Sequence, residues 1–143
     1  MATRTKPSRR LVELVRTRAC FRCEYCHAPE QLTGQRCQMD HITPRIRGGK
    51  TEPDNLCLAC AACNSFKLDR IEAADPESAK SADLFNPRMQ NWHDHFAWNT
   101  DGSQIVGLTP TGRATISALK MNRPLAVAAR LSWAEIHRHP SED

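Results

Sequence analysis

Four segments of the chain have the apolar spacing of amphipathic helices. In the first segment, apolar side chains recur three and four residues apart, and Ser8 precedes them as an N-cap. In the third segment, Thr109 is the expected N-cap and Pro110 lies in the first turn. The predicted helices cover residues 8–19, 61–71, 109–121 and 124–136.

Shorter stretches have the period of β-strands. Apolar and polar residues alternate over 37–42, and a second short strand passes through residues 56–58. Between them, Pro44 and the Gly48-Gly49 pair predict an irregular loop. The first half of the chain therefore predicts a helix, two strands around a loop, and a second helix.

The second half predicts a surface connection over residues 72–91, a hairpin over 95–108 with its turn at 99–102, and the last two helices. Residues from about 84 to 138 are expected to form a C-terminal extension. Its arginines Arg88, Arg113 and Arg123 could extend a phosphate-binding surface, but we expect solvated side chains. The large apolar side chains expected in its core are Trp92, Phe96, Trp98, Ile105, Leu108, Ile116, Leu119 and Leu131.

Charge is distributed unevenly. The chain has 143 residues and a net charge of +4. Residues 1–50 carry eleven Lys or Arg against four Asp or Glu, a net +7, so the remainder sums to −3. A basic half favours a partner with dense negative charge, of which a nucleic-acid backbone is the commonest. Basic residues spread through the first 22 positions, including Arg4, predict neither a signal peptide nor a membrane span, and we expect a cytoplasmic protein.

Seven cysteines form two triplets and one single residue. Each triplet, Cys20/Cys23/Cys26 and Cys57/Cys60/Cys63, contains two overlapping C-x-x-C pairs, and Cys37 lies between them. In a reducing compartment, two such pairs predict a structural zinc ion with four thiolate ligands. The spacing alone does not select the pair used in each triplet.

The order of motifs between residues 18 and 70 resembles the HNH endonuclease family, in the subgroup with two zinc-binding C-x-x-C pairs. The shared elements are R-C-x-Y-C, D-H-I-x-P, G-G, N-L and C-x-x-C-N-x-x-K. The resemblance implies Cys23, Cys26, Cys60 and Cys63 as the zinc ligands. Cys20 and Cys57 are then expected to be buried thiols or neighbours of the metal shell, and Cys37 to face the core.

The resemblance implies an α+β fold with a ββα-metal (His-Me finger) motif braced by a four-cysteine zinc knuckle. A C-terminal extension of a hairpin and helices follows. We expect a single domain over residues 1–143, with the motif at about 18–70 and the extension packed on it.

Phosphodiester hydrolysis needs a base for the attacking water and a cation for the developing charge. Asp40 and Asn64 supply oxygen ligands for a divalent ion, and His41 suits the general base because its ordinary pKa lies near neutrality. The resemblance assigns His41 the same role and implies that Asn55 positions the catalytic loop. Because the third motif position is Asn64, an HNN variant, we expect Mg²⁺ or Mn²⁺ rather than Ni²⁺ or Zn²⁺ as the catalytic ion.

Lys67 is expected to contact phosphate or to pair with an acid, and Arg45, Arg47 and Lys50 are candidates for contacts with the DNA backbone. The sequence therefore predicts a metal-dependent DNA endonuclease that needs no cofactor besides metals. The alternatives are a zinc-stabilised nucleic-acid-binding protein that does not cut, and a zinc module for protein partners.

Overall fold

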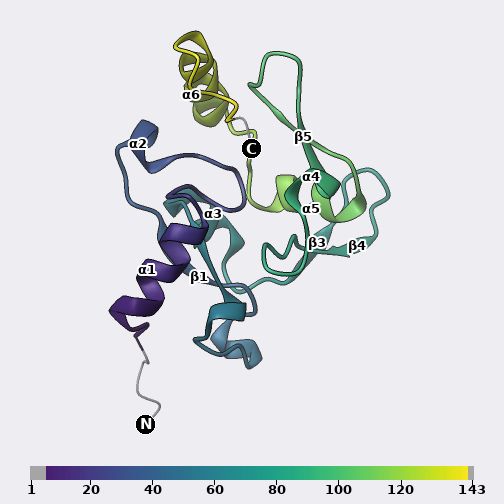
Figure 1. The fold of residues 1–143 in the computed structure, drawn as a ribbon. Helices are drawn as coiled ribbons and strands as arrows, with labels where there is room; N and C mark the ends of the chain where they lie inside the picture. Colours follow the sequence, from purple (N-terminus) through teal and green to yellow (C-terminus); the bar gives the residue numbers. More distant parts are fainter. Residues whose placement is uncertain (1–5, 142–143) are drawn as a thin grey trace. The chain divides into compact units, whose positions relative to one another are not determined.

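The computed structural model describes residues 6–141 (Figure 1). The chain forms two compact units. The first unit runs to Ile71 and also contains Asn86–Met89, and the second comprises Glu72–Phe85 and the chain from Gln90 onward. Arg4 lies outside the described residues. Each unit mixes short helices with antiparallel strands, which confirms the α+β class. The single-domain arrangement, with the extension packed on the motif, stays a prediction.

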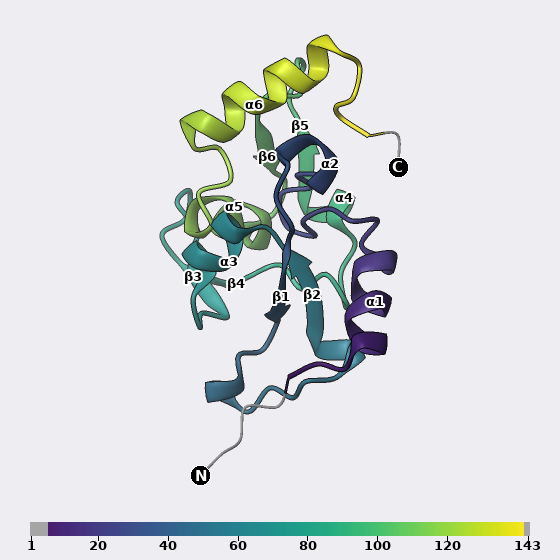
Figure 2. The same ribbon diagram turned by 90° about the vertical axis from the view of Figure 1, so that its left-hand side faces the viewer.

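The first unit is a two-stranded sheet flanked by helices. Strands β1 and β2 are antiparallel, with Asp40 opposite Cys57 and His41 opposite Leu56. Helix α1 packs on β2, and α3 packs on both strands; Figure 2 shows α1 along β2. The elements are α1 (Arg9–Arg18), α2 (Glu30–Thr33), β1 (Gln38–His41), the 3-10 turns η1 (Arg45–Arg47) and η2 (Pro53–Asn55), β2 (Leu56–Ala59) and α3 (Ala61–Lys67).

Local sequence explains why these helices begin where they do. Ser8 caps α1, and its hydroxyl accepts a hydrogen bond from the backbone N–H of Leu11 at 3.1 Å. Cys60 caps α3 through its sulfur, which accepts from the backbone N–H of Cys63. Strand β2 is buried along its whole length, so it forms the centre of the first unit's core. The predicted helix over 61–71 is shorter than expected because Leu68 has a left-handed backbone, with φ of 55°.

The second unit contains two further hairpins and three helices. Its elements are β3 (Glu72–Ala74), β4 (Ser81–Asp83), α4 (Trp92–His95), β5 (Phe96–Trp98), β6 (Ile105–Gly107), α5 (Pro110–Ala118) and α6 (Pro124–Glu135). Thr109 caps α5 as predicted, and its hydroxyl accepts from the backbone N–H of Gly112 at 3.0 Å. Helix α5 packs on β3, β4 and β6 and thereby joins the two hairpins.

Several expectations for this half are wrong. Residues 72–91 are not only a surface connection, because they contain the β3–β4 hairpin and the buried Asp75, which pairs with Arg113 at 2.9 Å. Arg113 is therefore an ion-pair partner rather than a solvated side chain. Leu108 and Leu131 are exposed instead of buried, whereas the core prediction holds for Trp92, Phe96, Ile105 and Leu119.

The chain around His139 also packs within the second unit. The side chain of His139 is buried; its Nε2 lies 2.8 Å from the carbonyl oxygen of Gly102, and its ring packs edge-on against Trp98. Among residues 6–141, no helix combines the length and the apolar character needed to cross a membrane.

Candidate active site and metal cluster

Four cysteines come together in the first unit. The sulfur atoms of Cys23, Cys26, Cys60 and Cys63 all lie within 4.8 Å of one another, and three of these residues are buried. The sulfur atoms of Cys26 and Cys60 are 3.7 Å apart. Tetrahedral zinc has Zn–S bonds of about 2.3 Å, which places neighbouring sulfurs about 3.8 Å apart. The cluster therefore fits a zinc ion.

The backbone around the cluster has the form of two matching knuckles. The N–H of Cys26 donates to the sulfur of Cys23, and the N–H of Cys63 donates to the sulfur of Cys60, each at 3.4 Å. Such bonds stabilise negative charge on the sulfur, which is the state a metal requires. The first knuckle follows α1, and the second joins β2 to α3, so the cluster ties the amino-terminal part of the unit to its sheet.

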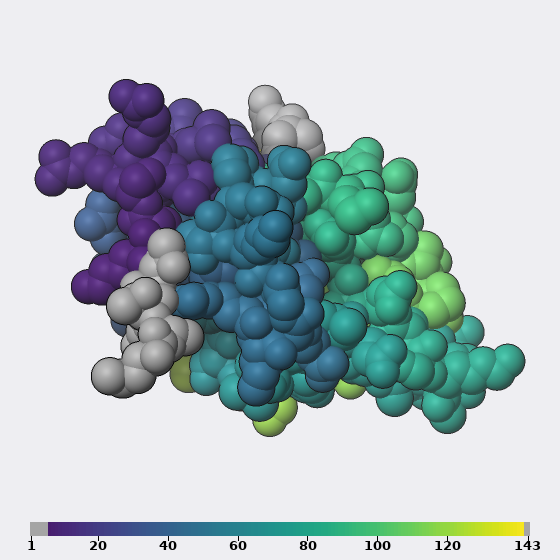
Figure 3. All heavy atoms as spheres, turned by 90° about the horizontal axis from the view of Figure 1, so that it is seen from below, coloured from purple at the N-terminus to yellow at the C-terminus, as the bar shows by residue number. Residues whose placement is uncertain are grey.

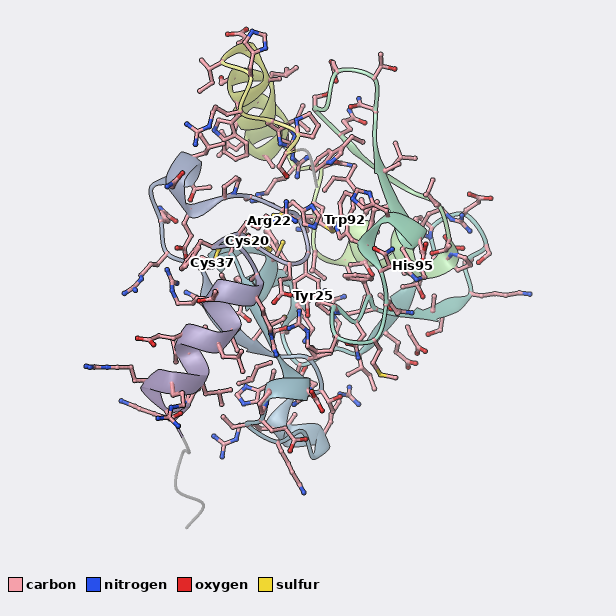
Figure 4. The ribbon with its side chains drawn as sticks, in the orientation of Figure 1. Cys20, Arg22, Tyr25, Cys37, Trp92 and His95 are labelled. Atoms are coloured by element: carbon pink, nitrogen blue, oxygen red, sulfur yellow. The ribbon has the colours of Figure 1, made fainter. Side chains whose placement is uncertain are left out.

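The other three cysteines differ in their surroundings. Burial raises the pKa of the Cys57 thiol well above its usual range and that of Cys37 to about 12. Neither thiol belongs to the four-sulfur cluster. Cys20, labelled in Figure 4, lies in the turn after α1 and is exposed, so of its two expected roles, a buried thiol or a neighbour of the metal shell, the first is wrong.

His41 ends strand β1 and is half-buried. Its Nε2 lies 2.8 Å from the hydroxyl oxygen of Thr51, which fixes the orientation of the ring. Burial lowers the pKa of His41, the nearby Asp40 opposes this shift, and the positive charges of Arg45 and Lys67 add to it. The imidazole is therefore neutral at pH 7, the form a general base needs.

The loop that follows His41 is held together by Asn55. The side-chain oxygen of Asn55 accepts from the N–H of Thr43 at 2.8 Å, and its nitrogen donates to the carbonyl oxygens of Thr43 at 3.0 Å and Lys50 at 2.9 Å. Gly49 makes this closure possible, because a Cβ there would stand 1.7 Å from the Thr43 carbonyl oxygen. This geometry supports a positioning role for Asn55.

Asp40 is buried inside a cluster of polar side chains from other elements. The hydroxyl of Tyr25 donates to Asp40 Oδ2 at 2.7 Å, and Lys67 Nζ lies 3.3 Å from the same oxygen. Tyr25 itself is fully buried in the interior of the unit (Figure 4). Lys67 also donates to the carbonyl oxygens of His41 and Ile42, each at 3.2 Å. Lys67 was expected either to contact phosphate or to pair with an acid, and in the structure it pairs with Asp40.

Asn64 lies beside the same strand. Its amide nitrogen donates to Gln38 Oε1 at 2.7 Å, so the amide oxygen is not used in this bond. Gln38 and Asp40 are two residues apart on β1 and therefore share a face. Gln38 contacts Asn64 and Asp40 contacts Lys67, and these two partners lie one helical turn apart on α3. The carboxylate of Asp40 and the amide of Asn64 therefore lie along one strand–helix interface.

Basic side chains surround the loop after His41. Arg45, Arg47 and Lys50 are exposed, and the guanidinium of Arg47 donates to the carbonyl oxygen of Asp69 at 2.8 Å. Figure 3 shows that the blue segment with η1 and η2 adjoins the purple α1 on one face of the first unit. The exposed positions leave these charges available to an anionic ligand.

Sequence reasoning did not single out two residues of the site, Thr51 and Tyr25. Thr51 lies ten positions beyond His41 in a loop, where no periodic pattern indicates a contact. Tyr25 lies between two zinc ligands in the R-C-x-Y-C element, and this position was the one feature of the sequence that could have pointed to a role for Tyr25 in the site.

A β-hairpin, a following helix, a histidine at the end of the first strand and a thiol cluster together define a ββα metal-finger unit. The family model described as HNH endonuclease matches residues 23–70, from the first knuckle to just beyond α3. The chain therefore contains an HNH endonuclease domain with a four-cysteine cluster suited to zinc. No curated protein and no solved structure matches the chain.

Proposed function

We propose that this protein is a metal-dependent DNA endonuclease with His41 as its general base. The observation that carries the proposal is the neutral, oriented imidazole of His41, held by Thr51 and adjacent to Asp40 within the HNH match. Phosphodiester hydrolysis requires a base at such a position.

In this mechanism His41 accepts the proton of a water molecule as its oxygen attacks phosphorus. Asp40 and Asn64 are the proposed ligands of Mg²⁺ or Mn²⁺, which when bound neutralises charge on the phosphate and on the leaving oxygen. Asn55 keeps the loop closed behind His41, and Arg45, Arg47 and Lys50 hold the DNA backbone. Cleavage leaves a 5′-phosphate and a 3′-hydroxyl.

Lys67 has a specific place in this scheme. Its ammonium is buried against Asp40, so a phosphate contact by Lys67 would require it to leave this position. An ion held by Asp40 would share the carboxylate with Lys67 or displace it. A zinc site with four thiolate ligands suits a reducing compartment, and we propose a cytoplasmic location for the reaction.

The pairing of Asp40 with Lys67 also favours a second candidate function. If the ammonium holds the carboxylate permanently, no divalent ion reaches Asp40. The protein would then be a zinc-stabilised nucleic-acid-binding protein that does not cut.

The test is relaxation of supercoiled plasmid by zinc-loaded protein, with Mg²⁺, Mn²⁺ or Ni²⁺ added. The wild type should nick the plasmid with Mg²⁺ or Mn²⁺, and His41→Ala should abolish nicking. His93→Ala, which changes an exposed histidine of the second unit, is the matched control and should cut like the wild type. Retardation of DNA on a gel without cleavage under any of these ions would favour the second candidate.

A further inference from the structure

Phe21 is an aromatic side chain that the proposed chemistry does not use. It lies in the turn between α1 and the first zinc knuckle, and its side chain is 47% exposed. Its backbone is left-handed, with φ of 57°, and so is that of Cys20, with φ of 56°. Large residues rarely adopt this conformation, so the fold must hold Phe21 in place.

Hydrogen bonds fix the backbone of Phe21 on both sides. Its N–H donates to the carbonyl oxygen of Arg16 at 3.1 Å, and the N–H of Cys20 donates to that of Thr17 at 3.0 Å, as in a Schellman helix end. Its own carbonyl oxygen accepts from the N–H of Glu30 at 3.0 Å. The backbone that carries the half-exposed ring is therefore fixed.

The ring borders two surface hollows. One, of about 540 Å³, is lined by Phe21 together with Arg9, Arg16 and Arg36, and Glu13 is its one acidic residue. The other, of about 440 Å³, lies on the side of Cys20 and Pro29. Because both hollows are open to solvent, a planar group can reach the ring, and the first hollow carries a net positive charge.

Arg16 is fixed over one face of the ring, which leaves the opposite face for a planar group. Its guanidinium carbon lies 5.4 Å from the centroid of Phe21, and its two terminal nitrogens bind Glu30 at 2.6 and 2.8 Å. Glu30 pairs with Arg16 and also lies within the field of Arg36, and the exposed side chains of Arg9 and Arg36 leave the hollow with surplus positive charge for a ligand. An exposed aromatic ring next to exposed guanidinium groups provides a stacking surface and phosphate contacts together.

We propose that Phe21 binds an unpaired nucleobase of the DNA, with Arg9 and Arg36 on the adjoining phosphates. A nucleotide strand offers both a planar π-face and phosphate charge, whereas an acidic peptide offers only the charge. The inference rests on the proposed function and specifies its substrate class: duplex DNA with a single-stranded flank or gap.

The test measures DNA binding by the zinc-loaded full chain with His41→Ala as background, so that the probe stays intact. The probes are a blunt duplex and the same duplex with a single-stranded overhang at either end, carrying 2-aminopurine in the overhang. Stacking on an aromatic ring is sequence-tolerant, so Phe21→Ala should weaken overhang binding roughly ten-fold. The blunt duplex should be affected less than about two-fold.

Two further variants separate stacking from folding. Phe21→Trp keeps an aromatic face and should retain overhang binding and the quenching of 2-aminopurine. Leu14→Ala removes an exposed apolar side chain of α1 that lies outside the hollow, and it should change the binding of neither probe.

Equal weakening of both probes by Phe21→Ala, or no weakening of either, would overturn the proposal. So would tight binding of an acidic peptide at the same hollow that displaces the overhang probe without a Phe21 dependence. The plasmid assay is independent of these results: a wild type that nicks plasmid keeps the proposed nuclease function even if Phe21 plays no part.

Discussion

At the scale of single residues, the orientation of His41 depends on Thr51. The hydroxyl of Thr51 is the partner of Nε2, so the other ring nitrogen, Nδ1, is the one that can face an attacking water. A residue that acts through the base in this way is a positioning residue.

Replacing Thr51 by Val should therefore lower kcat for plasmid nicking by about ten-fold while KM changes little, because the ring loses its orientation but the DNA surface is intact. Thr51→Ser keeps the hydroxyl and should restore most of the rate. If the Val and Ser variants are equally impaired, the hydroxyl is not what matters at this position.

Position 49 requires glycine because there is no space for a side chain, and not because of its backbone conformation. A methyl group at Gly49 would overlap the Thr43 carbonyl oxygen and crowd Asn55, so the loop behind His41 must open. We expect Gly49→Ala to slow nicking on the order of 10²-fold.

The neighbouring Gly48 supplies the control. It has φ of 90° but open space around it, so Gly48→Asn should retain activity within a few-fold, since Asn tolerates left-handed backbone. Similar activity losses in both variants would mean that loop closure does not depend on the contact of Gly49 with Thr43.

At the scale of elements, β1 and α3 are joined by a buried ion pair between Asp40 and Lys67. The side chains are 6% and 2% exposed, so neither charge is well hydrated. Tyr25 adds a hydrogen bond from a third segment of the chain. Removing one charge of such a pair is costly because the other is left buried alone.

Lys67→Met should lower the free energy of unfolding by about 3–5 kcal/mol, measured by denaturant titration monitored within the first unit. Added Mg²⁺ should recover part of this loss in the variant, because it replaces the ammonium at Asp40, and should affect the wild type less. Lys80→Met, at an exposed lysine of the second unit, is the control and should be neutral. A Lys67→Met variant that is indifferent to Mg²⁺ would argue against Asp40 as an ion ligand.

At the scale of the whole molecule, the two units have separate sources of stability. The first unit has a small core around β2 and the four-cysteine cluster, whereas the second has an aromatic core that includes Trp92 and Phe96. Structural zinc in small domains contributes an apparent free energy of roughly 10–16 kcal/mol to folding.

Removal of zinc should therefore unfold the first unit and leave the second folded. In hydrogen exchange, a chelator should abolish the protection of β1 and β2 while β5 and β6 remain protected. Cys63→Ser should lose the bound metal, and Cys20→Ser should keep one zinc per chain. Loss of protection across both units at the same chelator concentration would show instead that they unfold together.

The sequence alone predicted the parts of the site that depend on residue type and close spacing. Two C-x-x-C pairs predict a thiol metal site because each pair forms its own knuckle, and the family resemblance then selected the pairs Cys23/Cys26 and Cys60/Cys63. The Asp40-His41 dipeptide on a short strand puts its two side chains on opposite faces. The capped helix starts at Ser8 and Thr109 and the 95–108 hairpin were predicted for the same reason, since each signal lies within a few residues.

Only the tertiary structure decided which distant side chains share an environment. Tyr25, Asp40 and Lys67 come from three segments, and their contacts depend on how α3 lies against β1, which no local period encodes. The exposure of Cys20 and Phe21 follows from a left-handed helix end, and the burial of Asp75 follows from its ion pair with Arg113 on α5. Packing and long-range pairing set these features, because burial is a property of the surface that each element meets rather than of its own sequence.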